Sequence, residues 1–232
     1  MNHQKLGRFC LGLLAALALC AIAAPTASAI VEDKFRSSFE PTVMTAANEE
    51  PITLGINAGK AKWACKKSNL SGTFPMKVAA EIETFPTFKE CPATFDREGC
   101  VIRLSGRTND NNDAAIELGC PPGKEMTFTT ELCNVQIPAQ TLEGVSYVNG
   151  TETVGGVKRK DVTIKVTVTA MIYEKVPVKA LGCAFLGGAG EGKDGTLTGA
   201  YTATGYEDFS PPGPPVNEDE YIEGNVVDFE VE

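Results

Sequence analysis

The stretch "DVTIKVTVTAMIY", residues 161–173, is the feature that most restricts how this chain can fold. Apolar residues alternate with threonine and lysine along it, and most of the apolar residues are β-branched. Alternation over this length predicts a strand with one face in a protein core and the other in solvent. The core face is expected to hold Val162, Ile164, Val166, Val168, Ala170 and Ile172.

The chain after Pro51 carries the same signal in shorter pieces, and no segment shows a sustained helical period with caps. Short strands separated by Gly- and Pro-rich turns predict an all-β fold, an antiparallel sandwich or barrel stapled by disulfides. Asn149-Gly150 lies between two alternating runs, which predicts a hairpin turn at that point. Further strands are expected at 52–57, 62–65, 70–75, 80–88, 126–131, 133–138, 195–205 and 225–231.

The first 29 residues have the organisation of a secretory signal peptide. A basic start is followed by an uncharged run from Phe9 to Ala24 and by the small-x-small pattern Ala27-Ser28-Ala29. The apolar run is shorter than the ~20 residues that span a bilayer. We expect cleavage after Ala29 and a secreted or cell-envelope protein.

A lipoprotein signal is the alternative interpretation, because Leu17-Ala18-Leu19-Cys20 resembles a lipid-attachment box, although Leu19 fits poorly where a small residue is preferred. Beyond the signal peptide we expect a flexible leader over residues 30–50 and a single β domain over residues 51–232. A Pro-rich loop at 210–220 is expected to precede the last strand, because proline cannot donate to a ladder.

Cleavage of the signal peptide would limit the catalytic and metal-binding chemistry available to the mature chain. His3 is the only histidine, and it lies in the predicted signal peptide together with Cys10 and Cys20. The predicted mature chain therefore lacks an imidazole for Ser-His-Asp or Cys-His catalysis or for zinc ligation. The net charge of −9 becomes −11 when Lys5 and Arg8 leave, which argues against a nucleic-acid partner.

Six cysteines remain, an even number that predicts disulfides in an exported chain. If the polar middle around Asp110 is a hairpin loop, residues whose numbers sum to 220 face each other across two strands. Cys100 then faces Cys120 within disulfide range, which predicts a bond between them. In the same register Ile102 faces Leu118, Leu104 faces Ile116, Arg103 faces Glu117 as an ion pair, and Arg107 faces Asp113.

The other four cysteines are harder to pair from sequence. Our completion is Cys91–Cys133 with Cys65–Cys183. The rival is a pair of local loops, Cys91–Cys100 with Cys120–Cys133. In the rival, a straight strand at 125–133 would place Cys133 ~25 Å from the start of that strand and out of reach of Cys120.

Four segments together resemble a group of exported bacterial proteins of unknown function that have a signal peptide, spaced cysteines and a β-rich body. The resemblance covers residues 60–231 and implies a class and a compartment but no activity. The segments are "ECPATFDREGCVIRLSG", "IELGCPPGKEMTFT", "CNVQIPAQ" and "GTLTGAYTATG".

Two motifs resemble ligand loops. "GGAGEGKD", residues 187–194, nearly fits a phosphate loop, but Asp194 replaces the final Ser/Thr and a β pattern follows instead of a helix, so we interpret it as a mobile glycine loop. "NDNND", residues 109–113, offers oxygen ligands for calcium but lacks the EF-hand spacing. We interpret its Asp and Asn residues as ordinary turn residues.

Other candidate residues also have a plainer interpretation. Paired carboxylates are the only route left to acid/base catalysis, and Glu81 and Glu83 lie on one face of an expected strand, yet alternating Glu is common on wet strand faces. The basic cluster Lys158-Arg159-Lys160 is interpreted as a basic turn rather than an anion site. Trp63, Tyr147, Tyr201 and Tyr206 are candidates for a sugar-stacking platform, with Trp63 favoured as core.

We therefore expect a non-enzymatic exported protein with a binding or structural role outside the cell membrane. Its expected partner is a cell-wall or extracellular glycan or a protein, and no cofactor, metal, nucleic acid or membrane span is expected. The alternative is a carboxylate-dependent hydrolase acting on extracellular polysaccharide.

Overall fold

The computed structural model describes residues 34–74, 76–108, 114–180, 182–208 and 223–231. The chain divides into two units, residues 1–30 and 31–232, and all described residues belong to the second. The predicted signal peptide and the 109–113 and 210–220 loops lie outside the described residues. Among the residues that are described, no helix has the length and apolar character needed to cross a membrane.

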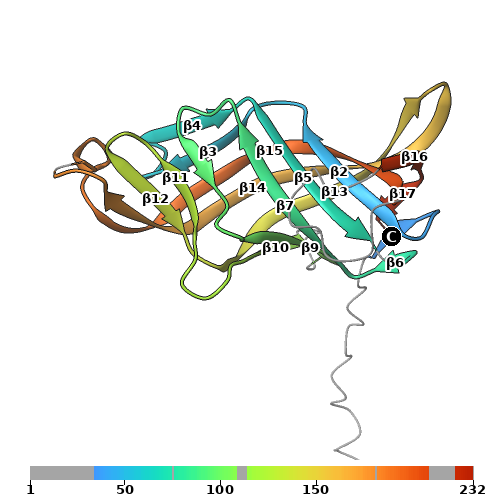
Figure 1. Cartoon of the computed structure of the whole chain (residues 1–232), viewed down its shortest axis with the longest axis horizontal. Helices are drawn as coiled ribbons and strands as arrows, with labels where there is room; N and C mark the ends of the chain where they lie inside the picture. Colours follow the sequence, from blue (N-terminus) through green and yellow to red (C-terminus); the bar gives the residue numbers. More distant parts are fainter. Residues whose placement is uncertain (1–33, 75, 109–113, 181, 209–222, 232) are drawn as a thin grey trace, which may run out of the picture. The chain divides into compact units, whose positions relative to one another are not determined.

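Eight antiparallel strands close into a barrel (Figure 1). The ring closes because its last strand, β14, pairs with its first, β15. The predicted all-β antiparallel fold is therefore confirmed, in its barrel form. The strands, in their order of pairing, are β15 (Gly190–Asp208), β2 (Thr42–Asn48), β5 (Lys67–Phe74), β7 (Glu81–Lys89), β9 (Val101–Thr108), β10 (Ala114–Gly119), β13 (Gln140–Val154) and β14 (Val157–Pro177).

The two longest strands, β14 and β15, extend at one end of the barrel, where five further strands join the same sheet (Figure 1). Residues 196–198 of β15 pair with β3, and residues 174–177 of β14 pair with β12. The added strands are β3 (Ile52–Ile56), β4 (Ala61–Cys65), β12 (Cys133–Ile137), β11 (Met126–Thr129) and β8 (Thr94–Asp96).

A small sheet of β17 (Phe229–Val231), β1 (Phe35–Ser37) and β6 (Val78–Ala79) packs beside β13 and β14. The remaining elements are β16 (Glu223–Val227), which pairs with β15, and η1 (Ala184–Leu186), a single 3₁₀ turn. The expected flexible leader over residues 30–50 is wrong, because it contains β1 and the barrel strand β2. Phe35 and Met44 are fully buried there, so this segment is part of the core.

The alternation in residues 161–173 is interrupted by a β-bulge at Ala170. Val162, Ile164, Val166 and Val168 point into the core as predicted. Ala170 then adopts φ +62°, and the pairing of β14 with β15 shifts between Val168 and Met171. A bulge adds one residue and so exchanges the two faces of a strand. The expected core positions Ala170 and Ile172 are therefore wrong, and the core positions are instead Met171, Tyr173 and Lys175.

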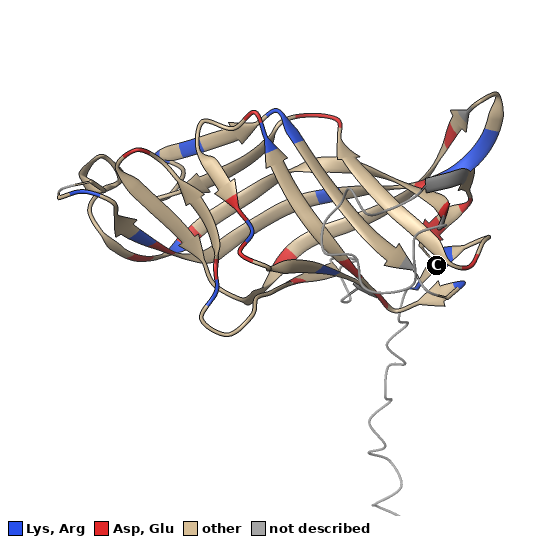
Figure 2. Ribbon diagram, viewed as in Figure 1, with Lys and Arg blue, Asp and Glu red and all other residues tan. Residues whose placement is uncertain are grey.

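The predicted turn at Asn149-Gly150 is also wrong, since both residues lie inside β13. The turn is formed by Gly155 and Gly156, with φ +59° and +83°, the positive pair that a tight two-residue hairpin requires. Lys158-Arg159-Lys160 consequently belongs to β14 and not to a basic turn; these residues lie on the extended ribbon of β13 and β14 (Figure 2).

Three disulfides join all six cysteines among the described residues. Cys100–Cys120 is confirmed, together with the predicted register that pairs Ile102 with Leu118. The completion Cys91–Cys133 with Cys65–Cys183 is wrong, and so is its rival. The actual bonds are Cys65–Cys91 and Cys133–Cys183.

The Cys65–Cys91 bond has the same structural cause as Cys100–Cys120. Strands β5 and β7 pair Lys67 with Lys89, and two residues further along the same register Cys65 faces Cys91 with Cα atoms 4.2 Å apart. Opposed residues of an antiparallel pair lie within disulfide range. Cys133–Cys183 differs, because it ties the start of β12 to the residue before η1.

Candidate functional site

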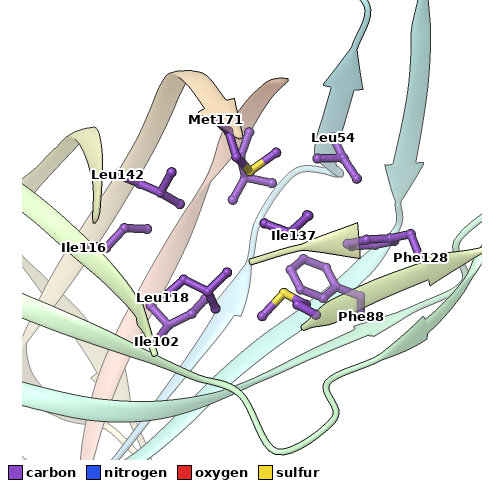
Figure 3. Close-up of a pocket in the computed structure, with 11 residues that line it drawn as sticks. Leu54, Phe88, Ile102, Ile116, Leu118, Phe128, Ile137, Leu142 and Met171 are labelled. Atoms are coloured by element: carbon purple, nitrogen blue, oxygen red, sulfur yellow. The ribbon is translucent and has the colours of Figure 1, made fainter. Parts of the chain in front are cut away.

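One cavity among the described residues is small and wholly apolar. Its volume is about 30 Å³, it lies among the barrel strands and the added strands β3, β11 and β12, and side chains from several strands point into it (Figure 3). A cavity of this size without polar partners neither orients a substrate nor stabilises water. It is lined by Leu54, Phe88, Ile102, Ile116, Leu118, Met126, Phe128, Ile137, Leu142, Met171 and Leu197.

The paired carboxylates Glu81 and Glu83 lie on the outer barrel face on either side of one guanidinium. Arg103 Nε lies 3.2 Å from a Glu83 carboxylate oxygen and 3.8 Å from one of Glu81, and Arg103 Nη1 donates to Glu117 over 2.9 Å. The predicted Arg103–Glu117 pair is therefore confirmed. These acids raise the pKa of Arg103, and the hydrogen bond that Arg103 donates to Glu83 raises it most, so a permanent cation contacts both carboxyls that a glycoside would need to reach.

The candidate aromatic platform does not assemble. Trp63 is buried in the core, as predicted, and Tyr201 is buried with its hydroxyl 2.8 Å from Ser68 Oγ. Tyr147 packs edge-on against Phe35 with ring centroids 5.3 Å apart. These three rings therefore stabilise the fold, and the fourth candidate, Tyr206, is half-buried on β15.

The glycine-rich segment 187–194 is not a mobile loop over its whole length, because β15 begins at Gly190. A strand and not a helix follows, as predicted. Gly192 faces Tyr173 across the ladder, and a Cβ on Gly192 would lie 2.2 Å from the tyrosine ring. The absence of a side chain here therefore makes room for Tyr173, while Asp194 is placed beside the β3–β4 turn.

The strongest candidate site is a surface pocket of about 350 Å³ between the β3–β4 turn and η1, here called the hairpin pocket. It brings together three segments that are far apart in the sequence. Its walls carry one exposed aromatic ring, one ammonium and one carboxylate among small residues. It is lined by Asn57, Ala58, Lys60, Ala61, Phe185, Leu186, Gly187 and Asp194.

The β-bulge at Ala170 places two side chains beneath this pocket, because it turns Tyr173 and Lys175 toward the core. Lys175 Nζ donates to Asn57 Oδ1 and to the carbonyl of Leu186, both over 3.1 Å. Asn57 Nδ2 also donates to the Leu186 carbonyl. A buried ammonium needs such partners, and here they join the β3–β4 turn to η1.

Asp194 is the polar centre of the hairpin pocket. Its Oδ1 accepts from the Tyr173 hydroxyl over 2.7 Å, and its Oδ2 accepts from the backbone N–H of Ala58 over 2.5 Å. The hydrogen bond from Tyr173 is the main cause that lowers the pKa of Asp194. Burial raises the pKa of Tyr173. At neutral pH the site therefore holds a fixed carboxylate and a protonated phenol.

The turn between β3 and β4 has an uncommon backbone. Asn57 and Ala58 have φ values of +53° and +51°, and Lys60 N donates to Asn57 O over 3.1 Å. Left-handed backbone costs a residue with a Cβ about 1 kcal/mol or more. This conformation directs the Ala58 N–H at Asp194 and the Asn57 N–H at the Tyr173 oxygen, 3.0 Å away.

Phe185 forms the apolar wall. It lies in η1, two residues after Cys183, whose disulfide with Cys133 anchors the turn. Leu186 is 2 % exposed and fastens the turn to the core, whereas Phe185 is 58 % exposed. The ring is thus held in solvent by a covalently anchored segment, a geometry that suits binding because little freedom is lost when a ligand arrives.

Tyr173, Lys175 and Asp194 form hydrogen bonds within the protein, and none of them is paired with a group that would take or give a proton in a reaction. Tyr173 donates to a carboxylate, Lys175 donates to two carbonyl oxygens, and Asp194 is held ionised. The arrangement can fix and orient a ligand, but it presents no activated nucleophile. Among the described residues, no group of three or more His, Cys, Asp or Glu is placed to hold a metal ion.

Sequence reasoning did not identify this pocket. It singled out Asp194 only as the residue that spoils a phosphate loop, and it expected Ala170 and Ile172 on the core face where the bulge instead places Tyr173 and Lys175. The calcium candidate at 109–113 lies outside the described residues. No protein-family model, curated protein or solved structure matches the chain, so the functional argument depends on the pocket itself.

Proposed function

We propose that the protein is an exported, non-enzymatic binding protein that acts outside the cell membrane, and that the hairpin pocket is its binding site. The three disulfides support this location, because such bonds form and persist in oxidising compartments. The signal-peptide pattern of residues 1–29 and the resemblance to exported β-rich proteins point the same way.

One observation carries the assignment of the site. Phe185 is 58 % exposed on a turn that a disulfide anchors, and it lines the same pocket as the Asp194 carboxylate. Small-molecule sites combine apolar side chains with a few polar atoms that set the orientation of the ligand, and this pocket supplies both.

The alternative, a polysaccharide hydrolase that uses Glu81 and Glu83, has less support. A retaining or inverting mechanism needs two carboxyls that both face the substrate. Arg103 Nε lies within ion-pair distance of both carboxylates, so both contact a cation of the protein itself. The hairpin pocket offers no second carboxylate beside Asp194 that would replace this pair.

The test is a nuclear magnetic resonance titration of the ¹⁵N-labelled protein with small molecules from several classes: sugars, amino acids, nucleosides and organic acids. At least one class is expected to shift the amide signals of Ala58 and Gly187 in a saturable way. Phe185→Ala should weaken this binding about fivefold or more, whereas Met76→Ala, which truncates a residue that is 56 % exposed outside the pocket, should leave it unchanged. Shifts confined to other residues, or no saturable shift at all, would refute the assignment.

A further inference from the structure

We infer that the hairpin pocket binds one neutral sugar ring, stacked on Phe185 and hydrogen-bonded to Asp194 and Lys60. This inference rests on the proposed function and names the ligand class of the same site. Its support comes from the chemistry of the pocket walls, from the charge balance at the rim and from the size of the pocket.

The apolar wall is one flat ring and little else. Phe185 is the only large apolar side chain in the pocket that is exposed, and the neighbouring walls are Ala58, Ala61 and Gly187. One ring face offers enough contact for the C–H face of a sugar but not for a wholly apolar ligand, whose affinity would depend on the area it buries. A sugar also keeps its other face in water, which suits a wall on one side only.

The polar wall offers one acceptor and one donor. Asp194 accepts only, and its position is fixed by Tyr173 and the Ala58 N–H. Lys60 donates only, and its side chain is exposed at the rim. Sugar hydroxyls donate and accept at once, so adjacent hydroxyls of a single ring satisfy both groups.

The charges at the rim favour a ligand without net charge. The Asp194 carboxylate and the Lys60 ammonium cancel, so an anionic or cationic ligand would meet one repulsive partner for each attractive one. The charge beneath the pocket, on Lys175, is buried and donates to Asn57 and Leu186. It supports the pocket from below and is not part of its lining.

The size of the pocket limits the ligand to one ring. Its volume of about 350 Å³ is at the lower end of the ~300–1,000 Å³ range of small-molecule sites. Because the pocket is on the surface, a longer glycan can continue into solvent from the bound ring. The pocket would therefore bind a free methyl glycoside and the terminal ring of a longer glycan through the same contacts. For this reason the test includes oligosaccharides as well as methyl glycosides.

The experiment compares matched rings by ¹⁵N chemical-shift titration of the whole chain. The ligands are neutral methyl glycosides of glucose, galactose, mannose and N-acetylglucosamine, then glucuronate, glucosamine and cyclohexanol as the anionic, cationic and apolar rings. At least one neutral glycoside should shift the amide signals of Ala58 and Gly187. Its dissociation constant should be at least about fivefold lower than those of glucuronate, glucosamine and cyclohexanol. Its oligosaccharide should shift the same amides.

The variants assign the contacts. Phe185→Ala should weaken the neutral glycoside about fivefold or more, Phe185→Trp should restore binding, and Lys60→Met should weaken it about threefold. Met76→Ala should leave it unchanged. If only charged or apolar rings shift these amides, the sugar inference is overturned while the proposed function stands. If no compound of any class shifts them, both are overturned.

Discussion

The side-chain amide of Asn149 pairs with the backbone of Val231 as if it were one more strand residue. Nδ2 donates to the Val231 carbonyl over 2.6 Å, and the Val231 N–H donates to Oδ1 over 2.8 Å. The last strand, β17, is thereby fixed to β13 by a side chain, and Lys160 Nζ strengthens the same junction by donating to Glu230 over 2.6 Å. The C-terminal strand depends on these side-chain contacts as well as on its backbone pairing with β1.

Replacing Asn149 by Ala is expected to lower the free energy of unfolding by about 1–2 kcal/mol, because it removes both hydrogen bonds to Val231. Urea denaturation measures the loss. Amide hydrogen exchange at Phe229 and Val231 should accelerate more than exchange in the barrel strands. Val148→Ala, at a neighbouring position that is 47 % exposed, is the control and should change stability by less than about 0.5 kcal/mol. Equal effects of the two substitutions would contradict the role of the Asn149 amide.

At the bulge, by contrast, we expect a substitution of Ala170 to raise the free energy of unfolding. Ala170 has φ +62°, a conformation that glycine adopts without the cost that a Cβ imposes. Ala170→Gly is therefore expected to raise stability by up to about 1 kcal/mol, whereas Ala64→Gly in the ordinary strand β4 should lower it by about 0.5–1 kcal/mol. Thermal melting of the two variants tests this, and a loss of stability in both would show that the backbone at Ala170 carries no strain.

The Cys100–Cys120 hairpin was predictable because several independent pairs agree on one register. Two apolar pairs, an ion pair and a cysteine pair all require that register, and a slip of one residue would break each of them. The Cys65–Cys91 bond follows the same geometry but lacks this agreement, since its last ladder pair before the cysteines opposes Lys67 and Lys89. Like charges facing each other give no sign of pairing.

The bulge and the hairpin turn were not predictable, because the local pattern favours the wrong answer in each case. Ala170 and Ile172 continue the apolar alternation, and alanine carries no signal for a left-handed backbone. Asn149-Gly150 and Gly155-Gly156 both satisfy the chemistry of a tight turn. The long partner strand β14 decides between them, because β13 pairs with it from Val145 to Val154.

The hairpin pocket could not be predicted from the sequence for a further reason. Its residues come from the β3–β4 turn, η1 and the start of β15, and its supporting residues come from β14 after the bulge. No local spacing connects these segments. They meet because β3, β14 and β15 lie in one sheet and because Cys133–Cys183 anchors η1.

Asp161 destabilises the protein at neutral pH. It is only 8 % exposed, and its Oδ1 has no hydrogen-bond partner. Burial raises its pKa, and the nearby carboxylates of Glu152 and Glu49 raise it further. Because the folded-state pKa lies above the unfolded-state value, the ionised carboxylate opposes folding at pH values above the folded-state pKa. This cost disappears as the pH falls below the unfolded-state value.

Asp161→Asn is therefore expected to raise the melting temperature at neutral pH by a few degrees and to have little effect in acid. The stability of the native protein should fall more steeply than that of the variant as the pH rises through the folded-state pKa of Asp161. Glu143→Gln on the neighbouring strand β13, an exposed position, is the control for removing one negative charge. The same gain in acid as at neutral pH would rule out a titration effect.

The disulfide that anchors η1 links stability to binding, and its removal separates the two roles. Cys133–Cys183 closes a loop of 50 residues and Cys100–Cys120 one of 20, so the chain-entropy estimate assigns the first bond about 4 kcal/mol and the second about 3 kcal/mol. Replacing both cysteines of either pair by serine should lower stability in that order in urea denaturation. Only the Cys133→Ser/Cys183→Ser variant, compared under conditions where both variants are folded, should also weaken ligand binding at the hairpin pocket, because Phe185 then loses its anchor. Equal binding by the two variants would mean that Leu186 and the Lys175 contacts alone hold η1 in place.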